Sequence, residues 1–363
     1  MDSTQILKIV IFVLLCYIAI RHMRNWVRRS YSNLQHDDNT GETEPFSLSG
    51  SADKEFDSIK SNTNTALTSR IQDTTRKHAN LPLKEYCIKS SYNSACTGYY
   101  VNLEMIKHVL SRGCRMVDFD VFYVKEDDNY YPKVGFTSDI ANNFIESKNT
   151  ILLDDVFSTI ATTAFSNPTP NKKDPLFINL RIKSNDSNIY TAVAKSIHAN
   201  LKSIMYDGKV SKDTELKELM GKIVIVFDKT IERNYKKYAK CDENDLKCYD
   251  IDNYINMESG SEDINLFHYT ELLEQSANPA LIKDDNMHTN TKVIKMAVPD
   301  FIATPANPKI DDFVIKHGCQ IVANRFDILD DNLKRYEMMF NDNDSGMLPL
   351  AVAVPYMIRL TQS

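Results

Sequence analysis

Residues 116–124 read MVDFDVFYV, and they carry the strongest strand pattern of the chain. β-Branched and aromatic residues alternate there with Asp118 and Asp120, so one face of the strand is predicted to be polar. Two more apolar stretches follow at 176–183 (LFINLRIK) and 222–228 (KIVIVFD). Stretches with the apolar spacing of a helix separate the three. This alternation of strands with helices predicts an α/β fold with a parallel sheet.

Further strand candidates extend this alternation in both directions. They are residues 85–91, 130–137, 265–270, 293–298 and 320–326, and helical spacing occurs at 102–111, 151–165, 188–205, 311–316 and 331–340. Seven or eight strands separated by helices or loops favour a (β/α)₈ barrel. A doubly wound sheet is less consistent with the sequence, because no G-x-G-x-x-G motif follows the first strand.

The composition is that of a folded protein without a basic surface. The chain has 363 residues, of which 42% are hydrophobic and 25% charged, with a formal net charge of −6. This balance argues against nucleic acid as a partner. Outside the N-terminal segments, roughly 280 residues remain, enough for one large barrel or two medium-sized domains. The seven cysteines are scattered without a C-x-x-C pair, which predicts free thiols in a reducing compartment and no zinc site.

The N-terminus is predicted to be a membrane anchor. Residues Ile6–Ile20 are almost wholly apolar, and Lys8 lies near enough to the outer end for its side chain to reach the interface. A cleaved signal peptide is the alternative, but the segment lacks an early positive cluster and an A-x-A site. Four arginines, at 21, 24, 28 and 29, follow the span. The positive-inside rule then predicts a single-pass protein with its body on the cytosolic side.

Polar composition sets the remaining boundaries. Residues 1–29 form the predicted anchor, 30–80 a polar tether with one short helix near Asp53–Ile59, and 81–363 the globular body. Within the body, residues 232–263 are rich in Asn, Asp, Lys and Tyr. This interval is predicted to be an internal linker between two halves of the body.

Residues 82–94 read PLKEYCIKSSYNS and residues 113–121 read GCRMVDFDV. They resemble the P-L-x-x-Y-x-I-x-S-S-H-N-T and G-C-R-x-V-E-L-D-x-W patterns of eukaryotic phosphoinositide-specific phospholipase C. Three more segments resemble motifs of that family in order: 175–181 (PLFINLR), 219–224 (LMGKIV) and 317–324 (HGCQIVAN). The resemblance covers about residues 81–360. It implies a distorted TIM (β/α)₈ barrel of the phospholipase-C-like phosphodiesterase type, with its site at the C-terminal ends of the strands.

The resemblance also implies a reaction and the residues that perform it. In the family, an inositol hydroxyl attacks the neighbouring phosphodiester, two histidines act as acid and base, and a calcium ion stabilises charge on the phosphate. The first histidine position falls on Tyr92, whose phenol has an ordinary pKa of about 10 instead of about 6.5. The second falls near Gly135 and Phe136, where no histidine is present. Both catalytic positions are therefore predicted to be lost.

The calcium ligands of the family are also incomplete. Asn93 and Asp120 are kept, and Asp118 replaces a glutamate with a side chain one methylene shorter. The last glutamate is replaced by Arg181, a fixed positive charge where the divalent ion would lie. The two aspartates are predicted to pair with Arg181 or Arg115, and a residual cation site at Asn93, Asp118 and Asp120 is the alternative. We therefore expect no cofactor, with Ca²⁺ required only if the site is active.

The second half of the body points the same way. A substrate-binding arginine, expected after a Y-P-K-G-T-R run, is absent from residues 298–301 (VPDF). We therefore predict a membrane-anchored, catalytically inactive phospholipase-C-like protein that acts as a structural, scaffold or interaction component. Two alternatives remain open. One is a module that binds a phosphoinositide or phosphate headgroup through Arg181, and the other is a phosphodiesterase with altered chemistry at Asp118 or Tyr92.

The expected partners follow from the anchor and the surface. They are the lipid bilayer, through Ile6–Ile20, and other membrane or virion proteins. The Asn-, Asp- and Lys-rich composition with a single anchor is typical of a large DNA virus, in which the body would lie inside a virion membrane. The basic stretch RNYKKYAK at 233–240 predicts either contact with anionic lipid headgroups or a solvated linker.

Overall fold

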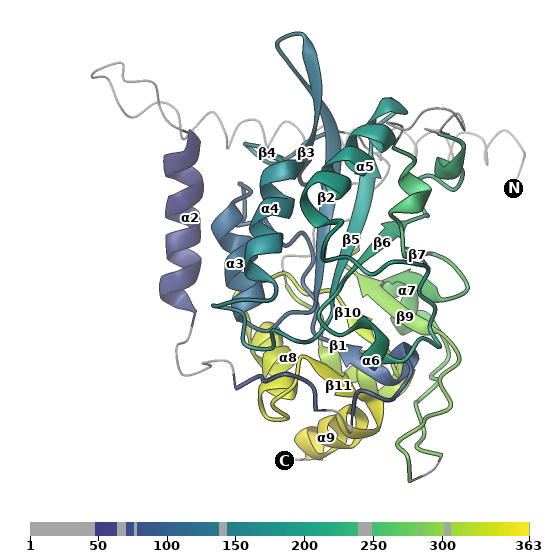
Figure 1. Cartoon of the computed structure of the whole chain (residues 1–363). Coiled ribbons are helices and arrows are strands. Elements are labelled where there is room, and N and C mark those ends of the chain that lie inside the picture. Colours follow the sequence, from purple (N-terminus) through teal and green to yellow (C-terminus); the bar gives the residue numbers. More distant parts are fainter. Residues whose placement is uncertain are drawn as a thin grey trace, which may run out of the picture. The chain divides into compact units, whose positions relative to one another are not determined.

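Parallel strands that follow one another along the chain form a curled sheet at the centre of the fold (Figure 1). The computed structural model describes residues 48–63, 70–75, 78–137, 144–238, 249–283, 285–300 and 306–362. Within these ranges, eight strands pair in parallel: β1 (Tyr86–Ile88), β2 (Met116–Glu126), β5 (Leu176–Lys183), β6 (Ile223–Asp228), β7 (Met257–Ser259), β8 (Ile264–His268), β9 (Ile294–Val298) and β10 (Ile321–Val322). From β2 onward each pairs with the next of the eight, and β10 pairs with β1.

Contacts just beyond the strand ends bring β1 next to β2. Ser90 and Met116 form a parallel bridge, and the Arg115 amide donates a hydrogen bond to the Lys89 carbonyl at 2.8 Å. The order of parallel strands therefore returns to its starting point, as it does in a TIM-like fold. The prediction of an α/β fold of this general type is confirmed by the strand pairing.

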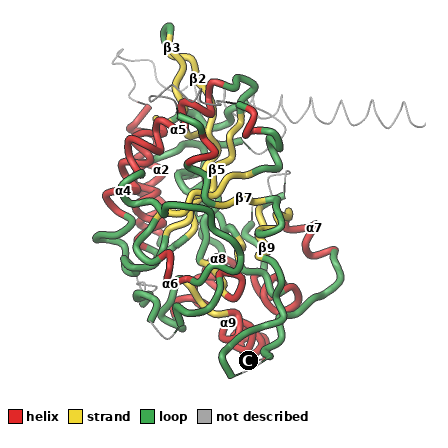
Figure 2. Tube along the Cα trace, turned by 45° about the vertical axis from the view of Figure 1, so that its right-hand side comes forward, coloured by secondary structure: helices red, strands yellow, loops and turns green. Residues whose placement is uncertain are grey.

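Short antiparallel strands extend the sheet at both ends of this order. β3 (Asn129–Gly135) forms a hairpin with β2, and β4 (Ile151–Leu152) pairs with β3. β11 (Met347–Pro349) pairs with β1. The β2–β3 hairpin projects beyond the neighbouring strands (Figure 2). Asp127 lies in its turn with a positive φ of 52°, a conformation that Asp adopts more readily than most residues.

Helices pack around the sheet, and α3, α4 and α5 lie together beside β2 and β5 (Figure 1). The described helices are α2 (Leu48–Asn62), α3 (Leu103–Ser111), α4 (Leu153–Thr163), α5 (Asn188–Leu201), α6 (Leu216–Leu219), α7 (Tyr269–Glu274), α8 (Asp331–Asn341) and α9 (Leu350–Gln362), with short turns η2 (Leu83–Glu85), η3 (Tyr235–Lys237), η4 (Ile251–Asn253) and η5 (Asp312–Lys316). A side chain caps the N-terminus of α3 and another caps that of α8. Asn102 accepts from the Glu104 amide at 2.8 Å before α3, and Asp330 accepts from the Leu333 amide at 2.7 Å before α8.

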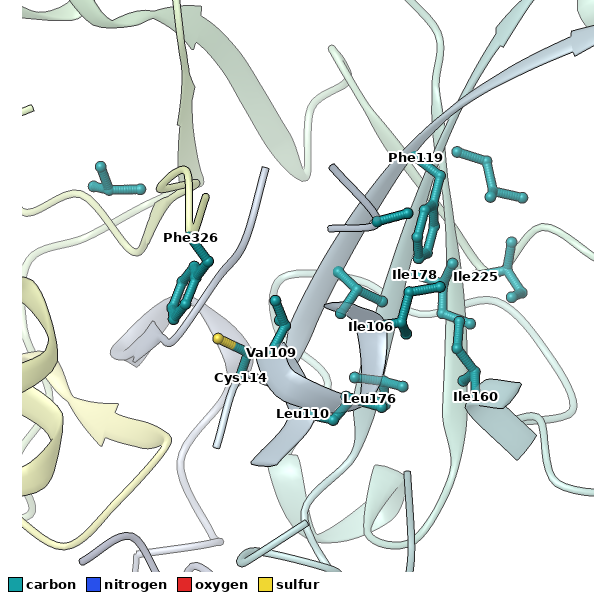
Figure 3. Close-up of a cluster of buried hydrophobic side chains, with 14 of the residues drawn as sticks. Ile106, Val109, Leu110, Cys114, Phe119, Ile160, Leu176, Ile178, Ile225 and Phe326 are labelled. Carbon is teal, nitrogen blue, oxygen red and sulfur yellow. The ribbon is translucent and has the colours of Figure 1, made fainter. Parts of the chain in front are cut away.

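Two apolar layers hold this arrangement together. Side chains that point into the curled sheet, such as Met116, Phe177 and Val224, form one buried cluster. Side chains on the opposite face of the strands pack against the helices, among them Phe119 and Ile178 (Figure 3). Because successive residues of a strand point to opposite faces, Phe177 and Ile178 lie in different layers. The same alternation decides which polar residues of β2 and β5 enter the interior.

The described part of the predicted tether (30–80) includes a helix that packs on the body. α2 is longer than the helix expected near Asp53–Ile59, and its Ala52, Phe56 and Ile59 side chains are buried. These residues recur at intervals of four and three positions, so they share one face of the helix. The helix expected in the tether is therefore present, but it is longer than predicted and packs on the body.

The interval 232–263 also differs from the linker that its composition predicts. It contributes β7 (Met257–Ser259), which pairs with β6 and β8, and its Tyr235, Ile251 and Ile255 side chains are buried. A strand of three residues is too short for an alternating pattern to stand out among polar neighbours. Its pairing with β6, which is distant in sequence, and with the adjacent β8 makes it a strand.

The predicted membrane anchor is not tested by this structure. Ile6–Ile20 lie outside the described residues. Among the residues that are described, no helix has both the length and the apolar character required to cross a bilayer. The anchor remains a prediction from the sequence.

Candidate functional site

Alternation along β2 and β5 brings the predicted site residues into the interior of the sheet. Asp118 and Asp120 on β2 lie in register with Asn179 and Arg181 on β5. All four are buried almost completely. Because residues two apart share a face, each strand contributes two polar side chains to the same side. The strand pairing therefore brings these four residues together in the interior of the sheet.

Arg181 joins the two aspartates. Its Nη2 lies 2.8 Å from Asp118 Oδ2, and its Nε lies 2.9 Å from Asp120 Oδ1. The predicted pairing of the aspartates with Arg181 is thus present. Arg115, the other predicted partner, instead donates to the Ala164 carbonyl at 3.1 Å, on the helix-covered side of β2. The guanidinium of Arg181 therefore occupies the position between the two carboxylates.

Two residues that follow β1 complete the surroundings of Arg181. Its Nη2 also donates to Asn93 Oδ1 at 2.9 Å. Its guanidinium carbon lies 4.1 Å from the centre of the Tyr92 ring, which is cation–π geometry. Tyr92 is half-buried, whereas Arg181 is only 1% exposed. The ring of Tyr92 thus covers the guanidinium.

Asn93 and Asn179 hold Asp118 in place. Asn93 adopts a positive φ of 42°, a conformation that Asn tolerates well. Its backbone amide donates to Asp118 Oδ2 at 3.0 Å. Asn179 Nδ2 donates to Asp118 Oδ1 at 2.8 Å. With the contact from Arg181, both oxygens of this buried carboxylate are engaged, which limits the cost of burying it.

Lys183 and Asp228 are site residues that the sequence analysis missed. Lys183 follows Arg181 by two positions on β5, and its Nζ lies 3.2 Å from Asp120 Oδ1. Asp228 ends β6 and accepts hydrogen bonds from the amide and hydroxyl of Thr230, at 2.9 and 2.6 Å. Both are buried. The two-residue spacing from Arg181 was the available signal for Lys183, whereas Asp228 required knowledge of the neighbouring strand.

Burial dominates the electrostatics of this cluster. It raises the pKa of Asp118 above its usual value despite the adjacent Arg181, and it lowers the pKa of Lys183. It also acts to lower the pKa of Arg181, but Asp118 and Asp120 outweigh it and raise that pKa. The pKa of Tyr92 is raised, chiefly by burial. Its phenol therefore stays protonated at neutral pH and is unsuited to accept a proton as a general base.

The position expected to hold the second histidine is closely packed. Gly135 pairs with Asp120 across the β2–β3 hairpin. A Cβ at Gly135 would lie 3.0 Å from Ser147 Oγ, which is tighter than ordinary contact. The Phe136 amide donates to that same oxygen at 3.2 Å. Neither this pair nor Tyr92 supplies an imidazole to the site.

A separate cleft of about 670 Å³ lies beside β7, and the basic stretch contributes to it. Lys236 pairs there with Asp252 and Glu258, and Tyr235 donates to Glu258 at 2.8 Å. Burial acts to raise the pKa of Glu258, but hydrogen bonds from Lys236, Lys229 and Tyr235 hold it at about 2. The charges of Lys229 and Lys236 are therefore paired with carboxylates whose lowered pKa keeps them ionised at neutral pH.

Comparison with known proteins finds similarity to the family that the motifs resemble. Residues 79–229 match the family model described as phosphatidylinositol-specific phospholipase C, X domain. A search of curated proteins found no match. Among solved structures, the chain is similar to PLC21 of L. pealei, at 18% identity and a TM-score of 0.55, over 75% of this chain and 37% of that one. PLC21 of S. officinalis is similar at 18% identity and a TM-score of 0.53, over 80% and 39%.

These matches confirm the resemblance to phosphoinositide-specific phospholipase C and extend it to the fold. The family match ends at residue 229, so it covers the segments that carry Tyr92, Asp118 and Arg181. The structural matches include most of this chain but less than two-fifths of the length of either PLC21. At this level of identity they show the fold alone.

Proposed function

We propose that this chain is a phospholipase-C-like protein that has lost phosphodiester hydrolysis and serves as a structural, scaffold or interaction component of a membrane. The observation that carries the proposal is the position of Arg181. Its nitrogens lie within 2.9 Å of carboxylate oxygens of both Asp118 and Asp120, which the family resemblance assigns to calcium. A bound divalent cation would have to displace a buried guanidinium of like charge.

The residues of the site do not fit a calcium ion. Calcium takes six to eight oxygen ligands at about 2.3–2.6 Å, but the oxygens of Asn93, Asp118 and Asp120 are turned toward nitrogens of Arg181. Acid–base catalysis is equally unsupported, because Tyr92 and Gly135 stand at the expected histidine positions. No catalytic step is therefore assigned to this chain.

The location of the protein is part of the same proposal. The apolar Ile6–Ile20 segment and the arginines that follow it support a single-pass protein with its body on the cytosolic side, or inside a virion membrane. The partners would be the bilayer and other proteins of that membrane. Protease protection of the full-length protein inserted into microsomes tests this orientation, since the proposed topology leaves residues 48–363 accessible from the cytosolic face.

Restoring the missing ligand tests the loss of the calcium site. The full-length protein in detergent micelles is compared with Arg181→Glu, which supplies a carboxylate, and Arg181→Gln, which only removes the charge. We expect calcium to raise the unfolding temperature of Arg181→Glu but not of the other two proteins. Calcium-dependent hydrolysis of phosphatidylinositol by the unaltered protein, or a calcium-induced shift in its unfolding temperature, would overturn the proposal.

One observation favours a second candidate function, the binding of a phosphate headgroup. Arg181 Nη1 has no hydrogen-bond partner among the described residues, so it retains a donor. A phosphate that displaced the Tyr92 ring would reach it. Calorimetric titration of the full-length protein with inositol 1,4,5-trisphosphate and with inorganic phosphate tests this candidate. Binding that the Arg181→Gln substitution abolishes would support this candidate. Equal heats of binding for the unaltered protein and Arg181→Gln would rule it out.

A further inference from the structure

The helix α2 is attached to the loop that carries the site residues Tyr92 and Asn93. Its Glu55 carboxylate accepts from the Thr97 hydroxyl at 2.9 Å, the Tyr99 amide at 3.1 Å and the Tyr100 amide at 3.3 Å. Two residues away, Asp53 Oδ1 accepts from Asn102 Nδ2 at 3.0 Å. The Glu55 side chain alone thus accepts from three donors of one loop.

The backbone of this loop is shaped to receive a carboxylate. Gly98 has a φ of +129°, which L-residues rarely adopt, and a Cβ there would lie 3.5 Å from Glu55 Oε2. This conformation turns the amides of Tyr99 and Tyr100 toward the same point, as in the anion-binding nests formed by successive backbone N–H groups. The loop therefore depends on α2 to satisfy these donors.

Apolar contacts support the polar ones. The ring of Phe56 meets the ring of His108 on α3 edge to face, with centroids 6.0 Å apart. Phe56 and Ile59 belong to the same buried cluster as the α3 residues Met105 and Val109. α2 therefore packs against α3 through apolar side chains and is joined to the loop by hydrogen bonds.

The same loop also contacts the segment that precedes β4. The Val101 amide donates to Asn149 Oδ1 at 2.8 Å, and Asn149 Nδ2 donates back to the Val101 carbonyl at 2.9 Å. The Lys148 amide donates to the Tyr99 carbonyl at 2.8 Å. Ser147, next in this segment, accepts from the Phe136 amide. A continuous series of contacts therefore links Glu55 to both positions that the family reserves for histidine.

We propose that α2 is a brace that holds residues 93–102 and 144–149 in place and thereby keeps Tyr92 closed over Arg181. Because α2 lies within the predicted tether (30–80), displacement of the tether would act on the loop after Tyr92 through Glu55. The brace concerns the conformation of this loop and holds whether the site is inactive or binds a phosphate. Its test therefore uses no activity and no ligand.

Amide hydrogen exchange of the full-length protein in detergent micelles tests the brace. In Glu55→Gln, the Tyr99 and Tyr100 amides lose a charged acceptor and should exchange about tenfold faster. The brace further predicts faster exchange at Asn93 and Ser94, whose amides donate to Asp118 in the site. Asp57→Asn, an exposed change on the same helix, is the matched control and should leave all four amides unchanged.

A second variant separates loss of the brace from loss of folding. Thr97→Val removes one donor from the loop side and should produce the same pattern of faster exchange, while amides of β5 stay protected in every variant. Faster exchange at Tyr99 and Tyr100 with unchanged exchange at Asn93 and Ser94 would overturn the proposal, because α2 would then only cover a surface loop. Unchanged exchange at all four amides would overturn it as well.

Discussion

Two buried clusters of charged residues in this molecule differ in how completely their hydrogen bonds are made. In the first, near α3 and α8, Glu337 accepts from Arg112 Nε at 2.9 Å, from Arg112 Nη2 at 2.6 Å and from Lys89 Nζ at 3.1 Å. Lys89 also donates to the Arg112 carbonyl at 2.6 Å. In the second, around Arg181, the Nη1 atom has no hydrogen-bond partner among the described residues, and Lys183 Nζ meets Asp120 without hydrogen-bond geometry.

The pKa values of the two clusters differ in the same sense. Burial acts to raise the pKa of Glu337, but Lys89 and Arg112 outweigh it and hold that pKa below its usual range. Burial prevails at Asp118, whose pKa is raised. The α3–α8 cluster is thus a fully bonded structural triad. In the part of the chain that the structure describes, the cluster around Arg181 keeps buried donors without hydrogen-bond partners, which is uncommon in protein interiors.

The largest expected effect comes from breaking the satisfied triad. Glu337→Gln leaves Arg112 and Lys89 buried without a counter-charge, and it should lower the free energy of unfolding by about 3–5 kcal/mol. Urea unfolding measures this loss. Glu104→Gln, which breaks an exposed pair with Lys107, is the control and should cost less than about 0.5 kcal/mol. A loss below about 1 kcal/mol for Glu337→Gln would contradict the reading of the triad as structural.

Arg181→Gln should have the next largest effect, about 2–4 kcal/mol. It is smaller because the stranded carboxylates of Asp118 and Asp120 can take up protons, whereas the Arg112 guanidinium cannot lose one. Arg181 acts to lower the pKa of Asp118, so without Arg181 the pKa of Asp118 in the folded protein rises further. Stability is therefore retained in acid and lost as pH rises, so the loss should be greater at pH 8 than at pH 5. Equal losses at the two pH values would refute the prediction.

Asp118→Asn and Glu337→Gln each replace a carboxylate by a neutral amide, and the stability that each loses should depend on pH in opposite directions. The pKa of Asp118 is raised in the folded protein. Its contribution to the free energy of unfolding is therefore present below its unfolded pKa of about 3.9 and is lost as pH rises above that value. Asp118→Asn should therefore cost more stability in acid than near neutrality. The folded-state pKa of Glu337 is lowered, so its contribution is present above about 4.3 and lost as pH falls.

Glu337→Gln should accordingly cost more stability near neutrality than in acid. Urea unfolding of both variants and of the unaltered protein from pH 4 to pH 7 measures the two slopes. If the loss of stability changes with pH in the same direction for both variants, the two clusters do not differ as their hydrogen bonds indicate.

The smallest expected effect concerns the ring over Arg181. Tyr92→Leu removes the cation–π contact and should lower the free energy of unfolding by about 0.5–2 kcal/mol. Tyr92→Phe keeps the aromatic face and should change it by less than about 0.5 kcal/mol. Thermal unfolding of both variants measures the difference. If the two substitutions cost the same, the contact with Arg181 contributes nothing measurable.

Most of the site was accessible from the sequence, because it lies on regular strands. The alternation in MVDFDVFYV places Asp118 and Asp120 on one face, and the family motifs identify Arg181 and Asn93 as their neighbours. Lys183 was accessible in principle, since it is two residues from Arg181 on the same strand. Asp228 was not, because its place in the cluster depends on the pairing of β5 with β6.

The irregular parts were less predictable for a different reason. β7 has three residues, which are too few for an alternating pattern, and α2 buries only a few apolar side chains, so the sequence predicts only a short helix near Asp53–Ile59. Both are stabilised by contacts distant in the chain. The pairing of β7 with β6 and the bonds from Glu55 to residues 97–100 are examples.

The amino-acid sequence by itself determined most of the strands and helices, the resemblance to a phospholipase C, and an arginine at position 181, where that resemblance expects a metal ligand. These depend on residue type and on periodicity along one strand, both of which are local. Only the tertiary structure decided that Arg181 contacts both aspartates, that Tyr92 covers it, and that α2 docks beside the loop that follows Tyr92. These contacts join residues that are far apart in the chain, and strand register and packing alone set their distances.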